Sequence, residues 1–510
     1  MAEASTIYDK VPYPSYTFPQ THPDRLATAA YLHGLNPASP ANCRVLELGC
    51  GDGTNLIAQA YALPESTFVG IDLSTVQIER AIDAAEKIGI KNIRFRAADI
   101  TSIAADELGR FDFITAHGLY SWVPDHVRRT VLDLYANCLA ENGIGYISYN
   151  TYPGCHIRQM VAGMMKFAAR DAAEPFDAVE DALAALEFVE RASENDSLYQ
   201  MTIRLELQQT EERSAENVFH DDLAEINQPF YFYEFAADIV RHGLRYITDA
   251  DPRINDLTML PQDVRSELDA ASSDRIEREQ YIDFIKGRRF RKSLVTHAVS
   301  KVLDESDAER INSLFIASQL RPDDPSSALD DQTPLKFHAP QGGIVELDHP
   351  LTKSLLAGLA GEWARPRLVE KELRRAAERI HSQETGTADA LSFILRLYES
   401  GTVTLCSYAN QIAVTEVSSA PRLSAFARHQ IENDSRAVMT LYNLNIDPEP
   451  ETIKVLLSLL DGKRTENELC TAIKEIFEVP EDEKDAFERE LPQMIRANLE
   501  KFAALGLLVG

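Results

Sequence analysis

Apolar runs and helical patterns alternate over about the first 150 residues of the chain. The apolar runs are short and rich in Val, Ile and Phe, which indicates strands buried on both faces of a parallel sheet. Segments of helical length and periodicity lie between them. This repeated strand–helix–strand order predicts a Rossmann-like, doubly wound α/β sheet with its ligand at the carboxyl ends of the strands. The predicted strands are Arg44–Leu48, Phe68–Leu73, Ile93–Ala97, Phe111–Ala116 and Gly145–Tyr149.

Local signals mark the ends of two helices. A helix from Pro23 to Gly34 has proline in its first turn and stops at a glycine. After the second predicted strand, Ser74 and Gln77 form a capping-box pattern ahead of an apolar helical face. These signals predict one helix before the first strand and another after the second.

The pattern changes beyond residue 155. Strand signals nearly vanish over residues 156–320, and helices are predicted at Ala178–Arg191, Phe232–His242 and Glu277–Val302. A stretch rich in Pro, Asp and Ser, Arg321–Thr333, then predicts a linker or an exposed loop.

The last part of the chain mixes helices with short strands. Two stretches share the order helix, helix, helix, glycine, strand, which predicts winged-helix-like units, although ordinary amphipathic helices would look similar. We therefore predict an α/β ligand-binding domain at 1–155, an α-helical middle domain at 156–320, a linker at 321–345 and a winged-helix-like α+β domain at 346–510.

Composition and charge narrow the class of protein. The 510 residues are 45% hydrophobic and 26% charged, which is typical of globular proteins and unlike collagen-like or disordered chains. With 51 basic and 80 acidic residues the net charge is −29. Such a field repels phosphate backbones and attracts a cationic substrate or a basic protein. We therefore expect no nucleic-acid partner.

Cysteine usage and apolar runs favour a cytoplasmic protein. The six cysteines include no C-x-x-C pair, so we expect reduced thiols and neither a disulfide framework nor a zinc site. The first residues lack the basic start and apolar core of a signal peptide, and no apolar stretch reaches the roughly 18 residues of a membrane span. No histidine has the spacing of a metal motif, so no metal is predicted.

A glycine-rich loop follows the first predicted strand. The run ELGCGDGTN at Glu47–Asn55 places three glycines at alternate positions between a strand and a helix. Glycines there let the backbone approach a ligand closely. The run does not meet the dinucleotide pattern G-x-G-x-x-G, because its sixth position is Thr54, and a P-loop would need Lys followed by Ser or Thr.

Carboxylates at successive strand ends indicate the ligand. Glu47, just before the loop, suits a cation better than a pyrophosphate. Asp72 is placed to accept the ribose hydroxyls, and Asp99 the adenine amino group. S-adenosyl-L-methionine carries a sulfonium and an ammonium and no phosphate, so we predict it as the cofactor, with NAD as the alternative. The predicted cofactor-binding residues are Tyr8, Tyr13, Glu47, Gly49, Gly51, Asn55, Asp72, Leu73, Asp99, Ile100 and His117, with Tyr8 and Tyr13 in a lid.

This arrangement resembles the class I S-adenosylmethionine-dependent methyltransferases, whose motifs cover about residues 40–150. Runs outside that range, at Tyr8–Ala27, Phe219–Phe235 and Gln280–Arg291, are similar to the bacterial methyltransferases with a methyltransferase regulatory domain. That group includes the rickettsial outer-membrane-protein lysine methyltransferases. The resemblance implies a homodimer formed through the middle domain and, more loosely, lysine side chains of a protein as methyl acceptors.

The methyl acceptor is expected after the fourth and fifth strands, where this superfamily binds its substrates. Aromatic walls there would suit a methylated ammonium through cation–π attraction. Each candidate could instead pack its loop, and the [DN]-P-P-[YFW] motif of many N-methyltransferases is absent, which leaves the acceptor open. The predicted catalytic residues are Tyr120, Trp122, Tyr149, Asn150 and Tyr152.

Two further features have structural as well as functional interpretations. His220 could reach the site from the middle domain. The basic cluster from Lys286 to Lys292 could bind an acidic partner or RNA, but a solvated helix face that pairs with the protein's own carboxylates is the ordinary explanation.

Three functions remain open from the sequence. A protein-lysine N-methyltransferase is the leading hypothesis, and a small-molecule methyltransferase is the second, because one fold hosts many acceptors. The third is a cofactor-binding regulator without catalysis, in which the winged-helix-like part binds DNA or a protein.

Overall fold

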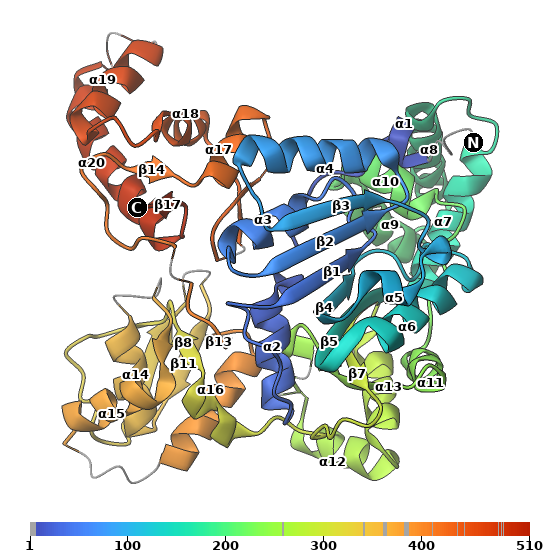
Figure 1. Ribbon diagram of the computed structural model, residues 1–510, viewed down its shortest axis with the longest axis horizontal. Coiled ribbons are helices and arrows are strands. Elements are labelled where there is room, and N and C mark those ends of the chain that lie inside the picture. The colour runs from blue at the N-terminus through green and yellow to red at the C-terminus, as the bar shows by residue number, and fades with distance from the viewer. Residues whose placement is uncertain are drawn as a thin grey trace.

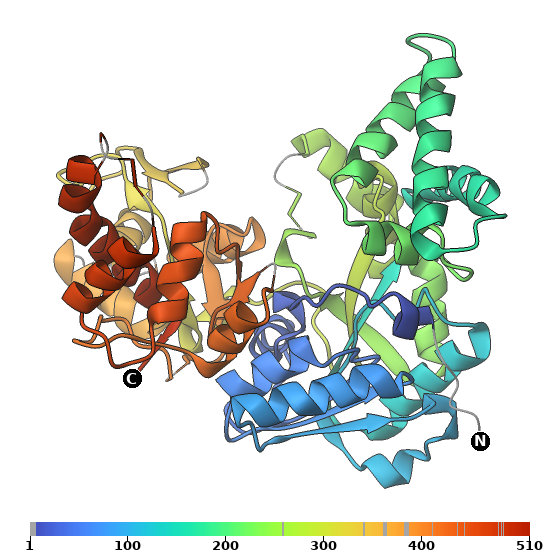
Figure 2. The ribbon, with the colours of Figure 1, turned by 90° about the horizontal axis from the view of Figure 1, so that it is seen from above.

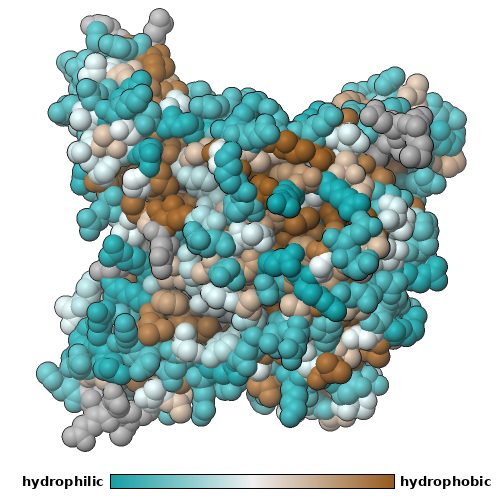
Figure 3. Space-filling view, in the orientation of Figure 1, coloured by the Kyte–Doolittle hydropathy of each residue, from teal (hydrophilic) through white to brown (hydrophobic). Residues whose placement is uncertain are grey.

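The computed structural model describes residues 7–510 apart from 255, 258–259, 340–341, 361–364, 382–386, 411, 436, 443, 478, 481 and 483, and for residues 7 and 8 it describes the backbone alone. The described chain forms a central α/β lobe, a helical lobe that projects from it and a C-terminal lobe (Figure 1, Figure 2). Hydrophilic side chains cover most of the face shown in Figure 3, with smaller hydrophobic areas between them.

A seven-stranded sheet in the order β3-β2-β1-β4-β5-β7-β6 organises the central lobe. The first five strands are parallel, whereas β7 is antiparallel to both of its neighbours. All five predicted strands are confirmed, although the last one begins earlier than predicted. The strands are β1 (Arg44–Leu48), β2 (Thr67–Asp72), β3 (Ile93–Ala97), β4 (Phe111–Ala116), β5 (Leu139–Asn150), β6 (Leu244–Asp249) and β7 (Phe290–His297).

Helices bury both faces of this sheet. Leu26 and Leu56 pack on one face against Val45, while Phe235 packs on the other face with Leu46. Successive strand residues therefore point into two different cores, which explains why the strands read as continuous apolar runs. The helices involved are α2 (Pro23–Leu32) and α3 (Thr54–Ala62) on the first face, and α5 (Ala105–Leu108), α6 (Asp125–Cys138) and α11 (Phe232–Arg241) on the second.

The capping signal after β2 is confirmed. Ser74 is the N-cap of α4 (Thr75–Ile88), and its hydroxyl accepts a hydrogen bond from the Gln77 amide at 3.0 Å. A short helix, α1 (Ile7–Lys10), precedes the α/β lobe.

The helical lobe is an insertion between β5 and β6. Its core contains Val161, Met165, Leu186, Ile203 and Val218, one or two from each helix. In Figure 2 the longer of these helices extend away from the sheet. They are α7 (Cys155–Ala169), α8 (Pro175–Ala192), α9 (Leu198–Glu211) and α10 (Ala215–Asp222).

Two strands lie in the part of the chain predicted to be helical. The helix predicted over Glu277–Val302 is wrong beyond Lys286, where α13 (Arg275–Lys286) ends. Gly287 adopts a left-handed φ of 58°, which closes the helix, and β7 follows. β6 and β7 thus join residues 244–297 to the central sheet, and α12 (Gln262–Ala271) lies between them in sequence.

The basic cluster forms internal ion pairs, as expected, but it lies on β7 and the turn before it and is largely buried, so the expected solvated helix face is wrong. Arg291 is fully buried and donates to both carboxylate oxygens of Asp283 at 2.8 Å and to Glu279 at 2.9 Å. Arg288 pairs with the same Asp283 at 2.7 Å, and Arg289 pairs with Glu206 of α9. These arginines therefore fasten α13 and the helical lobe to β7.

The C-terminal lobe contains small sheets packed with helices. Part of the predicted linker folds as one of these sheets, in the order β11-β10-β9. Helices α16 and α20 both end near a glycine with positive φ, Gly401 and Gly506, ahead of a short strand, which fits the predicted repeated order. The strands are β8 (Phe315–Ala317), β9 (Arg321–Pro322), β10 (Leu335–His338), β11 (Ile344–Leu347), β12 (Arg367–Leu368), β13 (Thr404–Cys406), β14 (Arg422–Leu423), β15 (Val438–Met439), β16 (Asn445–Ile446) and β17 (Leu508–Val509).

Helices pack against the small sheets of this lobe. They are α14 (Pro350–Leu359), α15 (Val369–Arg379), α16 (Thr387–Glu399), α17 (Ala425–Glu432), α18 (Glu451–Leu459), α19 (Glu466–Ile476) and α20 (Lys484–Ala504). Across the described ranges of the chain, no helix has the length and apolar character needed to cross a membrane.

Candidate active site

The glycine loop turns sharply from β1 into α3. Gly49, Gly51 and Gly53 have φ values of 73°, 54° and 73°, which L-residues with side chains rarely adopt. A Cβ on Gly53 would lie 2.6 Å from the ring of Phe95, so packing also demands glycine there. A Cβ on Gly51 would meet no atom within 4 Å. The loop therefore presents open backbone on its outer side at Gly51, where a ligand can approach closely.

Glu47 supplies a buried carboxylate at the end of β1. Its Oε1 accepts a hydrogen bond from Asn55 Nδ2 at 2.8 Å, while its buried Oε2 has no partner among the described residues. Burial, together with the nearby Asp72 and Asp52, raises the pKa of Glu47 to about 8, and the Asn55 bond offsets this in part. A cationic group placed beside Oε2 would satisfy this oxygen and keep the carboxylate ionised.

Asp72 closes β2 beside the same loop. Its Oδ2 accepts from the Gly51 amide at 2.8 Å and its Oδ1 accepts from the Ser74 amide at 2.9 Å. The side chain thus sets the position of the loop as well as presenting a carboxylate. Leu73, the next residue, is 55% exposed although it is apolar, so it offers an uncovered apolar surface at the strand end.

Asp99 and Ile100 follow β3 on the same edge of the sheet. Asp99 is exposed and caps the 3₁₀ helix Ile100–Ser102 by accepting from the Thr101 amide at 2.8 Å. Ile100 is largely buried against the core that α6 covers. Glu47 and Asp72 therefore lie at the carboxyl ends of β1 and β2, and Asp99 lies just beyond β3, as predicted.

The N-terminal segment lies across the loop. Ser15 bonds to Asp52 in the loop, and the Phe18 amide donates to Asn55 Oδ1 at 2.9 Å. The Phe18 ring packs on His117 with centroids 3.8 Å apart. The side-chain amide of Asn55 donates to Glu47 and accepts from the Phe18 amide, so Asn55 links the N-terminal segment to the site.

The two tyrosines predicted for a lid have different outcomes. The side chain of Tyr8 lies outside the described residues. Tyr13 is 40% exposed and lies against His220 of α10, with ring centroids 5.6 Å apart. His220 Nε2 bonds to the Val11 carbonyl at 2.6 Å. His220 thus anchors the N-terminal segment to the helical lobe.

His117 follows β4 and is held on two sides. Its Nδ1 bonds to the Tyr146 hydroxyl at 2.9 Å, opposite the contact with Phe18. Burial, with a smaller contribution from Lys292, lowers the pKa of His117 to about 3. The imidazole is therefore neutral at physiological pH and serves as a polar wall.

Two of the predicted catalytic residues are core residues instead. Tyr120 and Tyr149 are each 1% exposed and pack around Phe235 of α11. The Tyr120 hydroxyl donates to Asp238 at 2.8 Å, and the Tyr149 hydroxyl bonds to Ser293 at 3.1 Å. Because ring and hydroxyl are both occupied inside the core, neither side chain lines an accessible acceptor site.

The other three candidates lie at the carboxyl edge of the sheet or in the loops beside it. Asn150, which ends β5, donates from Nδ2 to Asn227 at 2.8 Å, while its Oδ1 accepts no hydrogen bond from the described residues. Tyr152 stacks on His156 with centroids 4.1 Å apart and lies 5.0 Å from Tyr231. Trp122, in the loop after β4, is partly exposed.

Sequence reasoning missed three partners of these residues. Phe18 covers His117, Ser121 accepts from the Asn150 amide at 2.8 Å, and Asn227 holds the Asn150 side chain. Their contacts join positions up to about a hundred residues apart, so no local pattern marks them. Tyr231 lies within the run Phe219–Phe235, whose pattern alone does not indicate a contact with Tyr152.

Comparison with known proteins agrees with this geometry. A family described as "Methyltransferase domain" matches residues 39–211, and the "Predicted methyltransferase regulatory domain" matches residues 214–297. The uncharacterized protein RP789 of Rickettsia prowazekii is 28% identical over 98% of this chain and 93% of its own length. The uncharacterized protein RP028 of the same organism is 36% identical over 45% of this chain and 91% of its own length.

Two solved structures of one methyltransferase match nearly the whole chain. PKMT2 from Rickettsia typhi is 26% identical and superposes with a TM-score of 0.86 over 98% of this chain and all of that chain. Its complex with AdoHcy superposes with a TM-score of 0.85. The chain belongs to the class I S-adenosylmethionine-dependent methyltransferases that carry a methyltransferase regulatory domain.

The methyltransferase therefore uses S-adenosylmethionine as its cofactor, and NAD is excluded. Its residues fit this group: Glu47 offers an unpartnered buried oxygen to a cation, and Gly51 leaves room for close approach. The assignment as an enzyme also removes the alternative of a regulator without catalysis. The segment that matches the regulatory domain includes β6 and β7, so it completes the sheet of the methyltransferase.

Proposed function

We propose that this methyltransferase transfers methyl groups from S-adenosylmethionine to lysine side chains of a protein substrate. The observation that carries the proposal is the likeness over nearly the whole chain to PKMT2, a rickettsial protein-lysine methyltransferase. That likeness includes the helical and C-terminal lobes, which the chemistry of methyl transfer itself does not require. The net charge of −29 further favours a basic protein as the partner.

The cofactor-binding part of the proposal rests on the strand ends. When bound, S-adenosylmethionine supplies an electrophilic methyl group on its sulfonium. Glu47 would hold the cationic amino-acid end, and Asp72 would accept from the ribose hydroxyls. Asp99, with Leu73 and Ile100, would hold the adenine, and the segment up to Phe18 would cover the loop.

The acceptor side needs a neutral amine, although a free lysine has a pKa of about 10.4. We propose that Asn150 Oδ1 accepts an N–H of this amine and directs its lone pair, because that oxygen has no partner in the described part of the chain. Desolvation on entering the site favours the neutral amine. Trp122, Tyr152 and Tyr231 would form the aromatic wall that binds a methylated ammonium.

The experiment is methyl transfer into a cell lysate. The full chain is incubated with cofactor labelled on its methyl group, macromolecules are separated from small molecules, and labelled proteins are digested and sequenced by mass spectrometry. We expect methyl-lysine in protein, and none with Asp72→Ala. Label confined to the small-molecule fraction would establish the small-molecule alternative, and protein label on another residue type would overturn the lysine assignment.

We also propose a homodimer formed through the helical lobe. Phe167 of α7 and Phe188 of α8 are 69% and 59% exposed and line an apolar groove together with Met160 and Met164. Exposed apolar surface of this kind is typical of an interface. Light scattering should give twice the chain mass, and Phe188→Glu should reduce it. The matched variant Phe284→Glu, on α13, should stay dimeric, and a monomeric wild type would contradict the proposal.

A cytoplasmic location completes the proposal. All six cysteines are free thiols in the structure, as expected in a reducing compartment. Thiol titration of freshly isolated, denatured protein should therefore find no disulfide.

A further inference from the structure

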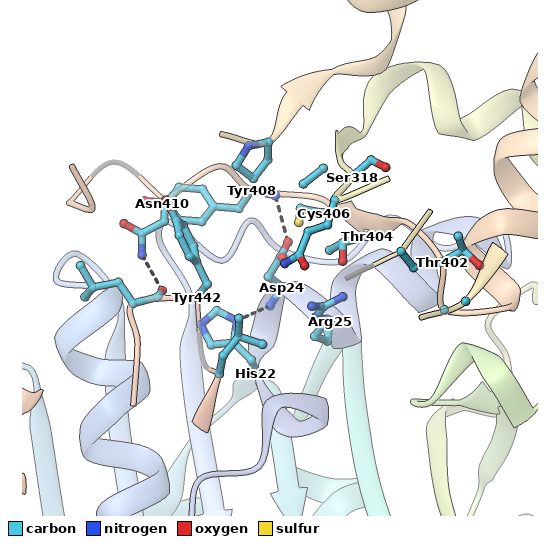
Figure 4. Close-up of a pocket in the computed structure, with 18 of the residues that line it drawn as sticks. His22, Asp24, Arg25, Ser318, Thr402, Thr404, Cys406, Tyr408, Asn410 and Tyr442 are labelled. Carbon is cyan, nitrogen blue, oxygen red and sulfur yellow. Dashed lines mark hydrogen bonds between the residues drawn. The ribbon is translucent and has the colours of Figure 1, made fainter. Parts of the chain in front are cut away.

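A cavity of about 760 Å³ lies between the start of α2 and the C-terminal lobe. Its volume is in the range of small-molecule binding sites. In Figure 4, His22, Asp24 and Arg25 from the first turn of α2 lie on one side, with residues of the C-terminal lobe around them. Apolar and aromatic side chains supply much of the remaining wall: Ile344, Val345, Tyr408, Leu441, Tyr442 and Leu444.

The α2 side of the cavity offers hydrogen-bond donors that the protein leaves without partners. Arg25, which is half-buried, forms no ion pair or side-chain hydrogen bond with the described residues. The imidazole of His22 accepts the Asp24 amide at Nδ1, 3.2 Å away. Burial lowers the pKa of His22 to about 3, so the ring is neutral and its proton is on Nε2. That N–H also has no partner in the described part of the chain.

The acidic residue beside them is already used. Asp24 Oδ1 accepts from the Ser407 amide and hydroxyl, each at 2.7 Å, and from the Tyr408 amide at 2.9 Å. These three bonds fasten α2 to the turn that follows β13. The free donors on the α2 side are the guanidinium N–H groups of Arg25 and the Nε2–H of His22, and the guanidinium is permanently charged. Arg25 interacts electrostatically with Asp24. Because its N–H groups donate no hydrogen bond to the described residues, an anionic group can still bind to them.

We propose that this cavity binds a small organic anion, a carboxylate or a phosphate ester with an apolar or aromatic body. Arg25 and the Nε2–H of His22 hold the anionic group. Tyr408, Tyr442 and the aliphatic wall pack on the body. In a chain with a net charge of −29, an arginine in a cavity whose N–H groups donate to no described residue is the feature that makes this site selective for anions.

The cavity is distinct from the cofactor site. Its lining residues include none of the strand-end residues that hold the cofactor. It adjoins that site through the segment before α2, where the Thr21 hydroxyl accepts from Asn55 Nδ2 at 3.1 Å. Anion binding can therefore be measured while S-adenosylhomocysteine saturates the cofactor site. The result then tests the anion site alone and does not depend on which molecule accepts the methyl group.

The test uses three fluorinated probes and the full chain in the presence of saturating S-adenosylhomocysteine. These are 4-fluorobenzoate, 4-fluorophenyl phosphate and the neutral 4-fluorobenzyl alcohol, followed by ¹⁹F NMR. We expect at least one anion to bind with a dissociation constant below about 1 mM, and the alcohol to bind at least tenfold more weakly. The dissociation constants of the two anions show whether the cavity prefers a carboxylate or a phosphate. Equal binding of the alcohol, or no binding of either anion, would overturn the proposal.

Variants locate the site. Arg25→Gln should weaken the anion at least tenfold, whereas Arg94→Gln, which removes an exposed arginine of β3, should leave it unchanged. Unaltered anion binding in Arg25→Gln would refute the assignment. Crystals of the wild-type chain soaked with 4-iodobenzoate or 4-iodophenyl phosphate give a readout independent of variant folding. The iodine should lie in the cavity with the anion on Arg25, and iodine found only elsewhere would overturn the proposal.

Discussion

The affinity for S-adenosylhomocysteine should depend on pH through Glu47. In the free protein the pKa of this carboxyl is about 8, mainly because of burial. The proposed partner of Oε2 is the ammonium of the ligand, and only the ionised carboxylate pairs with it. Binding therefore has to remove a proton from Glu47 at pH 7 and below.

The magnitude follows from that pKa. At pH 7 about one tenth of Glu47 is ionised, which weakens binding about tenfold, or roughly 1.4 kcal/mol, relative to a fully ionised Glu47 facing the same ammonium. At pH 6 the loss is about a hundredfold. A raised pKa in the folded state also means that the free protein loses stability as pH rises from 4.5, the ordinary value, to about 8. Ligand binding offsets this loss.

Calorimetry in two buffers of different ionisation enthalpy tests both consequences. Binding should strengthen about tenfold per pH unit between pH 6 and 7 and release close to one proton per ligand. Glu47→Gln should bind with little pH dependence and approach the wild type at pH 6. Asp106→Asn, which removes an exposed acid of α5, should behave as wild type. A wild-type affinity that changes less than twofold between pH 6 and 8, without proton release, would refute the reasoning.

Three other predictions concern single residues. Asp72→Ala should weaken the binding of S-adenosylhomocysteine by about 2 kcal/mol or more in calorimetry while the fold persists, because a charged acceptor is lost; unchanged affinity would mean that Asp72 does not hold the ribose. Arg291→Met should lower the free energy of unfolding by about 3–5 kcal/mol, since it leaves the buried Glu279 without its ion-pair partner and leaves Asp283 with Arg288 alone; Arg289→Gln, which replaces a partly exposed arginine, should cost less in the same denaturant titration. Gly53→Ala should lower the melting temperature, because its Cβ would collide with Phe95; an unchanged melting temperature would contradict the tight packing there.

The parallel part of the sheet could be predicted because each signal in it is local. A strand buried on both faces is apolar over most of its length, as in Phe111–Ala116, where only Asp112 and Thr115 are polar. The residues that follow such a strand need only the strand's direction to be placed. Glu47, Asp72 and Asp99 therefore fell on one edge of the predicted sheet without any knowledge of distant contacts. The structure confirms the strands that carry them.

The strand β7 was missed because its charges belong to a buried cluster. Arg291 and Lys292 interrupt the apolar pattern, and Arg291 faces Asp283 and Glu279 of α13. If Glu277–Val302 were one helix, the same charges would lie on a solvated face of that helix. The pairing of β7 with β5 distinguishes a strand from a helix here, and that pairing joins residues more than a hundred positions apart.

The acceptor side was harder to predict for a related reason. Aromatic residues after a strand are equally suited to line a site and to fill a core, and their position along the chain does not separate the two. Tyr120 and Tyr149 lie in the core because α11, far along the chain, brings Phe235 against them. Tyr152, at the same strand end, meets Tyr231 at the start of α11 instead.

The regulatory domain thus contacts the residues that we propose for the acceptor side of the site. Its residues 214–297 supply β7, which pairs with β5 up to Asn150, and Asn227, which holds the Asn150 side chain. They also supply Tyr231 and the His220 contact that anchors the N-terminal segment. A shift of α10 or α11 would therefore move Asn150, the aromatic wall and the cover over the glycine loop together.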